Sequence, residues 1–393
     1  MRARTFRPSQ RRSSRGLSLI EILVGVAIGL IGVVAIFQAV AVWTKHTQST
    51  SSGGDAQVAG TLALFNIERD IKQAGHGFGK AATPVMGCQV AMNQAPFGFA
   101  LRPVQIAASG SGAPDQISVL YGDSSFFVDE GSVTGSTAIS KTLKRRAGFK
   151  MGDLAVVAVN PGASAATASC QLIEITNDLL PDGVTLAHTD IPYANFYHGA
   201  SAPAVTPRFN DPASAPLATV GTMYNLGPQP VLNRWWIQGN RVLTRSEILQ
   251  IQASPEAQIA EGVINLKAEY GYDTNNNGQI DDSAVNVEWL TALPAGADWR
   301  RVLAIRVAVL VRSRQFERNP DPGASAAWAV TPSASNPYYF GDPVNRKFLM
   351  TNVNGQPDGF LDTDAVPNNW RYYRYRVYER VIPLRNLLWG TLS

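Results

Sequence analysis

The sequence is short of the residues on which most enzyme and metal sites depend. It has two cysteines and four histidines in 393 residues, and only 16% of its residues are charged. None of the paired Cys or His spacings of zinc sites occurs. A GxSxG turn, a phosphate-binding loop, a dinucleotide-binding glycine motif and an HExxH motif are also absent. The sequence therefore favours a structural protein over an enzyme, and we expect surface or linker positions for the histidines: His46, His76, His188 and His198.

Acidic residues are missing from the first 20 positions, and no charge occurs between Glu21 and Lys45. Six arginines precede this uncharged stretch. As a helix, residues 22–42 would be about 31 Å long, which matches a hydrocarbon core of about 30 Å. Arginines before a span hold the N-terminus in the cytoplasm. We expect a single span of the inner membrane at about residues 22–43, with a cytoplasmic N-terminus and a periplasmic head.

Glu21 is the fifth residue after Gly16, at the start of the apolar stretch. A lone acid in a membrane-length segment is costly unless it has a partner. Cleavage after Gly16 would create a free amine on Leu17, and in staggered parallel helices Glu21 of one chain could meet the amine of its neighbour. We expect this pair to drive assembly into a filament.

The segment Gly16-Leu17-Ser18-Leu19-Ile20-Glu21 closely resembles the processing site of type IV pilins and type II secretion pseudopilins. The resemblance implies cleavage after Gly16 by a prepilin peptidase and methylation of Leu17. Family members more often have Phe where this chain has Leu17. Two other interpretations stay open: a signal peptide cut near Ala41, which would release a secreted enzyme, and a plain membrane anchor.

The net charge argues against nucleic acid as a partner. The whole chain is formally +4, but the six leader arginines account for more than this excess, so the mature chain would be +4 − 6 = −2. The two cysteines, Cys88 and Cys170, would pair outside the cytoplasm and close a loop of about 80 residues, contributing roughly 4 kcal/mol. The alternative is two buried free thiols.

The apolar pattern predicts an α+β fold: a long N-terminal helix packed on an antiparallel β-sheet, elaborated with long loop insertions. We expect a leader at 1–16, a helix at 17–75 and a β-rich head at 76–393. Gly53-Gly54 should bend or interrupt the helix. Val58, Leu62, Phe65 and Ile71 recur at helical spacing and should form its buried face. The expected strands are 116–121, 154–159, 171–176, 235–238, 241–245, 264–272 and 301–313. The expected loop insertions are 123–150, 177–230 and 318–370.

Near the C-terminus, Tyr373, Tyr375, Val377 and Val381 form an apolar row that predicts a further strand. Its arginines, Arg374, Arg376 and Arg380, should point outward. This segment and residues 299–308 resemble PilW-type minor pilins, as does the size of the chain. The resemblance implies other minor pilins, pilus subunits and a tip adhesin as partners.

Residues 273–281 match the first nine positions of an EF-hand loop. Oxygen ligands would come from Asp273, Asn275, Asn277, the backbone of Gln279, and Asp281. The twelfth position is Ala284 instead of Glu, so Asp282 or Glu288 would have to complete the site. The alternative is a hairpin turn without metal. Calcium is thus an expected cofactor only if the loop is an EF-hand-type site.

The leading hypothesis is a minor pilin that initiates or caps a type IV pilus and ends at the filament tip on the cell surface. A second is a minor pseudopilin of a type II secretion system. A third, of another class, is a membrane-anchored calcium-dependent binding protein or sensor.

Overall fold

The computed structural model describes residues 18–391, apart from 82–84, 92–97, 110–112, 125–130, 146–147, 160–168, 179, 200–201, 211–220, 240, 250–255, 282–286, 315–338, 341–347 and 350–374. The predicted cleavage site, Gly16 and Leu17, lies outside the described residues. The chain divides between Gly53 and Gly54 into two compact units. Each is described by itself below, and the second is called the head.

Helix α1 spans Leu19–Gln73 and contains 55 residues. The predicted interruption at Gly53-Gly54 was wrong, because the helix continues through both glycines. Glycine in a helix costs roughly 1 kcal/mol relative to alanine, but its backbone adopts helical angles without strain. Long helical stretches on both sides are enough to carry the helix across the pair. Residues 54–73 belong to the head.

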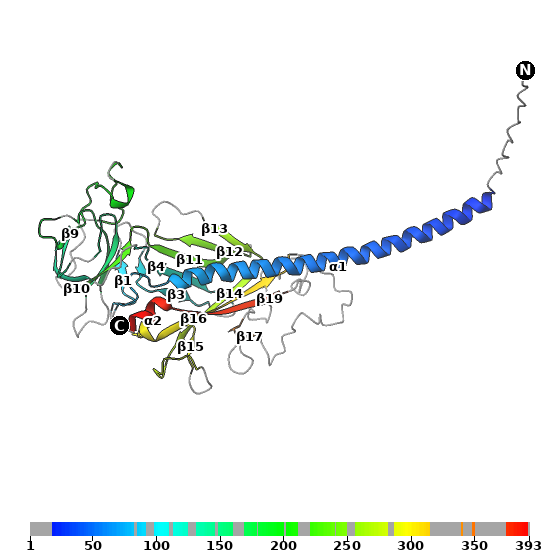
Figure 1. Ribbon diagram of the computed structural model, residues 1–393. Coiled ribbons are helices and arrows are strands. Elements are labelled where there is room, and N and C mark those ends of the chain that lie inside the picture. The colour runs from blue at the N-terminus through cyan, green and yellow to red at the C-terminus, as the bar shows by residue number, and fades with distance from the viewer. Residues whose placement is uncertain are drawn as a thin grey trace, which may run out of the picture. The chain divides into compact units, whose positions relative to one another are not determined.

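The head contains most of the β-structure, in mainly antiparallel sheets beside the last part of α1 (Figure 1). The eight-stranded sheet has the order β2-β1-β8-β7-β10-β5-β6-β9, with bounds Phe99–Ala100, Gln89–Ala91, Ser169–Glu174, Leu154–Val159, Gly221–Gly227, Gly131–Ser136, Ser140–Leu143 and Thr185–Ala187. The five-stranded sheet has the order β13-β12-β11-β4-β3, with bounds Ala257–Glu261, Val242–Glu247, Val231–Gln238, Gln116–Tyr121 and Val104–Ala107. One pairing, β1 with β8, is parallel.

The four-stranded sheet, β15-β14-β16-β19, has the bounds Trp289–Leu290, Val263–Tyr272, Val302–Arg312 and Tyr375–Pro383. A two-stranded ribbon pairs β17 (Tyr339–Phe340) with β18 (Phe348–Leu349). The short helices are η1 (Phe196–His198), η2 (Trp299–Arg301) and α2 (Arg385–Thr391). The predicted α+β class is therefore confirmed.

The main hydrophobic core joins the head part of α1 to strands of the three larger sheets. A second core lies among β5–β10 and includes Phe149, Val157 and Leu186. Two of the predicted loop insertions, 123–150 and 177–230, contain strands of this second core: β5, β6, β9 and β10. Gly, Ser and Thr are frequent in these segments, and in β5, β6 and β9 at most every second residue is buried, which concealed these short strands. Most of the third insertion lies outside the described residues.

Candidate functional site

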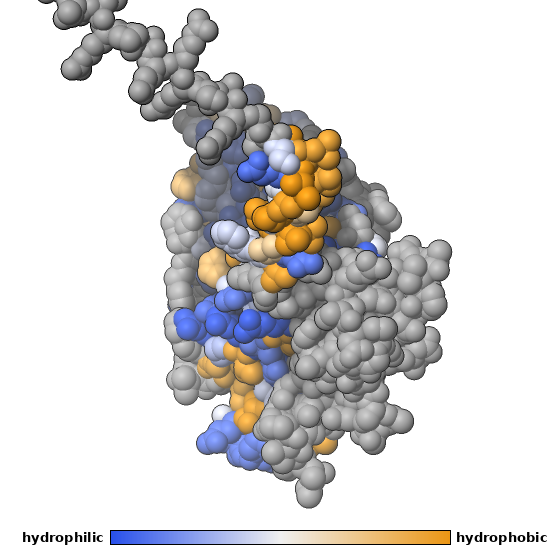
Figure 2. All heavy atoms as spheres, turned by 90° about the vertical axis from the view of Figure 1, so that its right-hand side faces the viewer, coloured by the Kyte–Doolittle hydropathy of each residue, from blue (hydrophilic) through white to orange (hydrophobic). Residues whose placement is uncertain are grey.

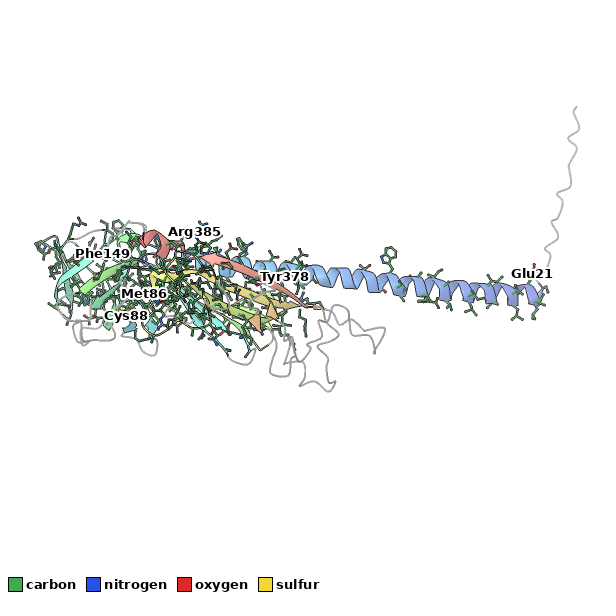
Figure 3. The ribbon with its side chains drawn as sticks, turned by 90° about the horizontal axis from the view of Figure 1, so that it is seen from below. Glu21, Met86, Cys88, Phe149, Tyr378 and Arg385 are labelled. Atoms are coloured by element: carbon green, nitrogen blue, oxygen red, sulfur yellow. A yellow bond between two sulfur atoms is a disulfide. The ribbon has the colours of Figure 1, made fainter. Side chains whose placement is uncertain are left out.

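Glu21 lies in the first turn of α1, at the far N-terminal end of the helix (Figure 3). Its Oε2 accepts the backbone N–H of Ser18 at 3.4 Å, and the carbonyl of Ser18 accepts the N–H of Ile22 at 3.2 Å. A Glu that reaches back in this way forms one half of a capping box. The carboxylate therefore makes one long hydrogen bond within its own chain, which leaves acceptor capacity for a cation from another chain.

One segment within the described residues, Leu19–Thr44, is long and apolar enough to cross a membrane. None of it is buried, and Figure 2, which looks along the helix from its N-terminal side, shows apolar side chains on the surface. Exposure of so many apolar residues in one run indicates that they are covered by lipid or by other chains. The helix thus has the length and the apolar composition of the membrane anchor that the sequence predicted.

In the head, α1 buries a different face from the one that the sequence predicted. Val58, Leu62 and Phe65 are 67%, 43% and 60% exposed. The buried face lies next to the predicted one around the helix and consists mainly of small and aliphatic residues: Ala56, Gly60, Ala63, Leu64, Ile67 and Ile71. Of the predicted face, only Ile71 is buried. The prediction was wrong because it followed the helical spacing of the large apolar residues, whereas this helix packs closely through its smaller residues.

The outward row Val58, Leu62 and Phe65, called the outer stripe below, has the spacing i, i+4, i+7 along one face. Three large apolar side chains at this spacing form a continuous apolar surface over two turns of the helix. Such a face is typical of a helix that packs against a second helix. The outer stripe is therefore a candidate contact surface of the head.

Strand β19 contacts α1 through the face that was predicted to point outward. Ile382 is fully buried, whereas Val381 is 50% exposed. Tyr378 packs against the main core close to Gly60 (Figure 3). Arg380, predicted outward, forms an ion pair with Glu68 of α1. Arg376 and Arg380 are exposed, as predicted, and Val377 packs against a small buried cluster on the other face of the sheet. The prediction was wrong for Val381, because β19 has apolar residues on both faces.

Sequence reasoning missed Asp70, which fixes α1 on the five-stranded sheet. It is fully buried and accepts Nδ2–H of Asn233 at 2.7 Å and Nε1–H of Trp235 at 3.0 Å, both from β11. The hydroxyl of Tyr121 in β4 donates to it at 3.4 Å. Burial raises the pKa of Asp70 in spite of these hydrogen bonds. A carboxylate between two apolar turns was the available signal, because such a residue must find partners inside the fold.

Cys88 and Cys170 form the predicted disulfide, with their Cα atoms 6.0 Å apart and 82 residues apart in sequence. Cys170 lies in β8, and Cys88 directly precedes β1, which pairs with β8. The bridge ties the segment after α1 to the eight-stranded sheet. A disulfide agrees with an exported head.

The predicted calcium loop folds back on Asp273, which is buried. Its carboxylate accepts the N–H groups of Asn277 at 3.1 Å and Gly278 at 2.8 Å. The side-chain amides of Asn275 and Asn277 donate to Asp281 at 3.3 and 3.0 Å. The structure thus brings together four of the five predicted ligands. The N–H of the fifth, Gln279, donates to Asn277 at 2.9 Å.

Glu288 closes this loop from the far side. It is fully buried and accepts the N–H of Thr274 at 3.0 Å and of Asp281 at 2.7 Å. Contact with Glu288 is the main cause that lowers the pKa of Asp281, followed by the amides of Asn277 and Asn275. In the described part of the chain, no three His, Cys, Asp or Glu side chains are placed to hold a metal ion. Calcium therefore stays a prediction, and Asp282 lies outside the described residues.

The histidines differ in their surroundings. His198 is exposed, and Nδ1 of His76 lies 3.1 Å from the carbonyl of Gly122. The prediction of a surface or linker position was wrong for His188, which is 3% exposed. It follows β9 and faces the second core. A single histidine without a recognisable spacing to other residues gives no means of predicting this burial.

Two family models match the chain. The model of the prokaryotic N-terminal methylation motif matches residues 11–37, which include Gly16, Leu17 and Glu21. The model described as type IV pilus-assembly protein W (PilW) matches residues 236–386, which include β14, β16, β19 and the 273–281 loop. No curated protein and no solved structure matches the chain. A methylation motif on an apolar N-terminal helix and a PilW region in the head make the chain similar to PilW-type type IV pilins, and the two family models support this assignment.

Proposed function

We propose that this chain is a minor pilin that is cleaved after Gly16, enters the filament through its N-terminal helix, and initiates or caps a type IV pilus. The observation that carries the proposal is Glu21, a single carboxylate at the start of the exposed apolar run Leu19–Thr44. Within the described residues, its carboxylate accepts a hydrogen bond from the N–H of Ser18. In lipid or in a filament, a second partner with positive charge would stabilise it, and the new amine of Leu17 in a neighbouring chain provides one.

The outer stripe supports the same role. Side chains of this size at helical spacing lose unfavourable contact with water when another helix covers them, by about 25 cal/mol per Å² of apolar surface. The covering helix would be that of a neighbouring pilus subunit. The large head favours the filament tip, since a bulky domain would crowd its neighbours along a shaft. The role is structural instead of catalytic, with other minor pilins, a tip adhesin and the prepilin peptidase as partners.

Glu21→Ala tests the assembly role against a plain capping role. Ser18→Ala is the matched control, because it alters the same helix start and keeps the carboxylate. We expect Glu21→Ala to abolish the pili that this chain initiates, while Ser18→Ala assembles normally. Equal defects would reduce Glu21 to a helix cap, and normal pili in Glu21→Ala would contradict the proposal.

Mass spectrometry of the mature N-terminus tests cleavage, because the expected first residue is methylated Leu17.

A deletion separates the pilus from the alternative of a type II secretion pseudopilin. Loss of twitching with intact secretion supports the pilus, and the reverse supports the secretion system.

Immunogold labelling tests the tip position. Even labelling along the shaft would contradict capping.

We also propose that the 273–281 loop takes calcium, with Glu288 in place of the missing twelfth ligand. The observation in favour is the buried Glu288 next to Asp281, because two neighbouring carboxyl side chains can both supply oxygen ligands to a divalent cation. Calorimetric titration of the full chain in detergent should show heat of binding that Asp281→Ala removes. Asp190→Ala, an exposed acid outside the loop, is the control. Absence of heat and of a melting shift at millimolar calcium would end the proposal.

A further inference from the structure

The outer edge of the eight-stranded sheet contains two buried basic side chains. Lys141 in β6 is fully buried, and His188, the residue after β9, is nearly so. Strands β6 and β9 pair with Lys141 opposite Leu186, so His188 is the diagonal neighbour of Lys141 on the same face of the sheet. The N–H of His188 donates to the carbonyl of Ile139 at 2.8 Å, which fixes this register.

Neither side chain has a carboxylate partner among its described contacts. Nζ of Lys141 donates to the carbonyl of Thr137 at 2.9 Å, and Nε2 of His188 is buried without a hydrogen-bond partner. A buried charge without a counter-charge, next to a buried nitrogen without a partner, is costly to the pairing of β6 with β9. The strands hold this arrangement only while His188 stays neutral.

Burial lowers the pKa of Lys141 to about 8. Burial first, and the positive charge of Lys141 second, lower the pKa of His188 to about 3. Three acids occur on the segments next to β9, namely Asp178, Asp182 and Asp190, and none offsets these effects. Asp182 is exposed and accepts the N–H groups of Val184 and Thr185 at 3.1 and 2.9 Å.

We propose that Lys141 and His188 make this edge of the head acid-sensitive: in mildly acid solution, protonation of His188 separates β9 from β6 while the other strands stay paired. Opening takes the imidazole into water, where it can hold its proton, and removes it from the charge of Lys141. It also leaves β6 with an unpaired edge, of the kind that accepts a strand from another chain.

The sign follows from the pKa values of the closed and open states. The pKa of His188 in the closed state is below its ordinary value of about 6.5, so the open state binds the proton more tightly. The closed pairing is therefore fully favoured above about pH 6.5 and loses stability as the pH falls towards 3. Within this window the equilibrium constant for opening rises by up to about tenfold per pH unit. Lys141 is protonated in both states there and adds no slope.

Hydrogen exchange of the full chain in detergent tests the proposal between pH 7.5 and 4. We expect the protection factors of the amides that bond β6 to β9, corrected for intrinsic exchange, to fall by up to about tenfold per pH unit below 6.5, whereas β6 amides that bond to β5 should keep theirs. Amides of β7 and β10 should keep theirs. His188→Phe, which is apolar and neutral at every pH, should flatten the pH dependence, and His198→Phe at an exposed histidine should leave it unchanged.

Lys141→Met provides a second variant in case His188→Phe does not fold. Without the neighbouring charge, the pKa of His188 rises in the closed state, so the loss of protection should end at a higher pH. Protection that does not change with pH in the unmodified chain would overturn the proposal. So would an equal loss in β7 and β10, which indicates general acid unfolding, or an unchanged slope in both variants.

Discussion

The two faces of α1 in the head differ in a way that reverses the usual relation between side-chain size and burial. The face against the sheets is made largely of Ala, Gly and Ile, whereas the outer stripe has the Val, Leu and Phe side chains that would fill a core. The sheets approach the inner face closely, so that mainly small side chains fit there. Among the described residues, no sheet limits the size of the side chains on the outer face. Large apolar residues on the exposed face of a packed helix indicate a contact surface for another chain.

Two contacts explain why the inner residues must be small and why their position along the helix is fixed. A Cβ atom added at Gly60 would overlap the ring of Tyr378 in β19, so the two elements touch through the missing side chain. Asp70, nearly three turns further along the helix, accepts hydrogen bonds from Asn233 and Trp235 in β11. Close packing sets the separation of helix and sheet, and the buried carboxylate sets the register.

The largest effect is expected where the inner face fills the core. Ile67→Ala removes a fully buried side chain and should lower the free energy of unfolding by about 3 kcal/mol. Leu62→Ala on the outer stripe removes a side chain of equal size and should cost less than about 1 kcal/mol. Chemical denaturation of both variants in detergent gives the comparison. Equal losses would mean that the outer stripe is packed within the chain and is no free surface.

Gly60→Leu tests the close approach directly. The new side chain must displace Tyr378, and overpacking of this kind should cost about 2 kcal/mol. Tyr378→Ala makes room for it, so the double variant should lose less than the sum of the two single variants. The difference is a coupling energy that a double-mutant cycle measures. Simple additivity would show that Gly60 and Tyr378 are not held together in solution.

Asp70→Asn should have a smaller effect, about 1–2 kcal/mol, because the amide keeps one acceptor oxygen but brings two donors to a site that needs none. Burial raises the pKa of Asp70 in the folded state. The folded state therefore binds the proton more tightly, and the contribution of Asp70 to stability falls as the pH rises through that raised pKa. The difference between the original chain and the variant should accordingly widen in acid. A difference that narrows in acid would contradict the buried, raised-pKa state of Asp70.

The contrast between faces also marks where sequence reasoning succeeded. Residues 116–121 and 154–159 were predicted as strands with the bounds of β4 and β7, because short apolar runs between Gly, Pro and Asp are unambiguous. The methylation motif, the apolar helix and the disulfide were likewise visible in the residues. The buried face of α1 and the exposure of Val381 in β19 were not, since each element has apolar residues on two faces. Only the element that packs against them decides which face is buried. That element can be far away in sequence: Glu68 of α1 and its partner Arg380 of β19 are more than 300 residues apart.

Phe65→Ser should have the smallest effect on stability and decides what the outer stripe is for. Phe65 is 60% exposed, so the free energy of unfolding should change by no more than about 0.5 kcal/mol. If the outer stripe contacts a neighbouring subunit, the same substitution should reduce the amount of this chain recovered in sheared pili while its level in the membrane stays constant. Thr61→Ser, an exposed position on the same turns of α1, is the control and should be recovered normally. Normal recovery of Phe65→Ser would leave the N-terminal run Leu19–Thr44 as the part of α1 that carries assembly, and would limit the role of the head helix to holding the sheets.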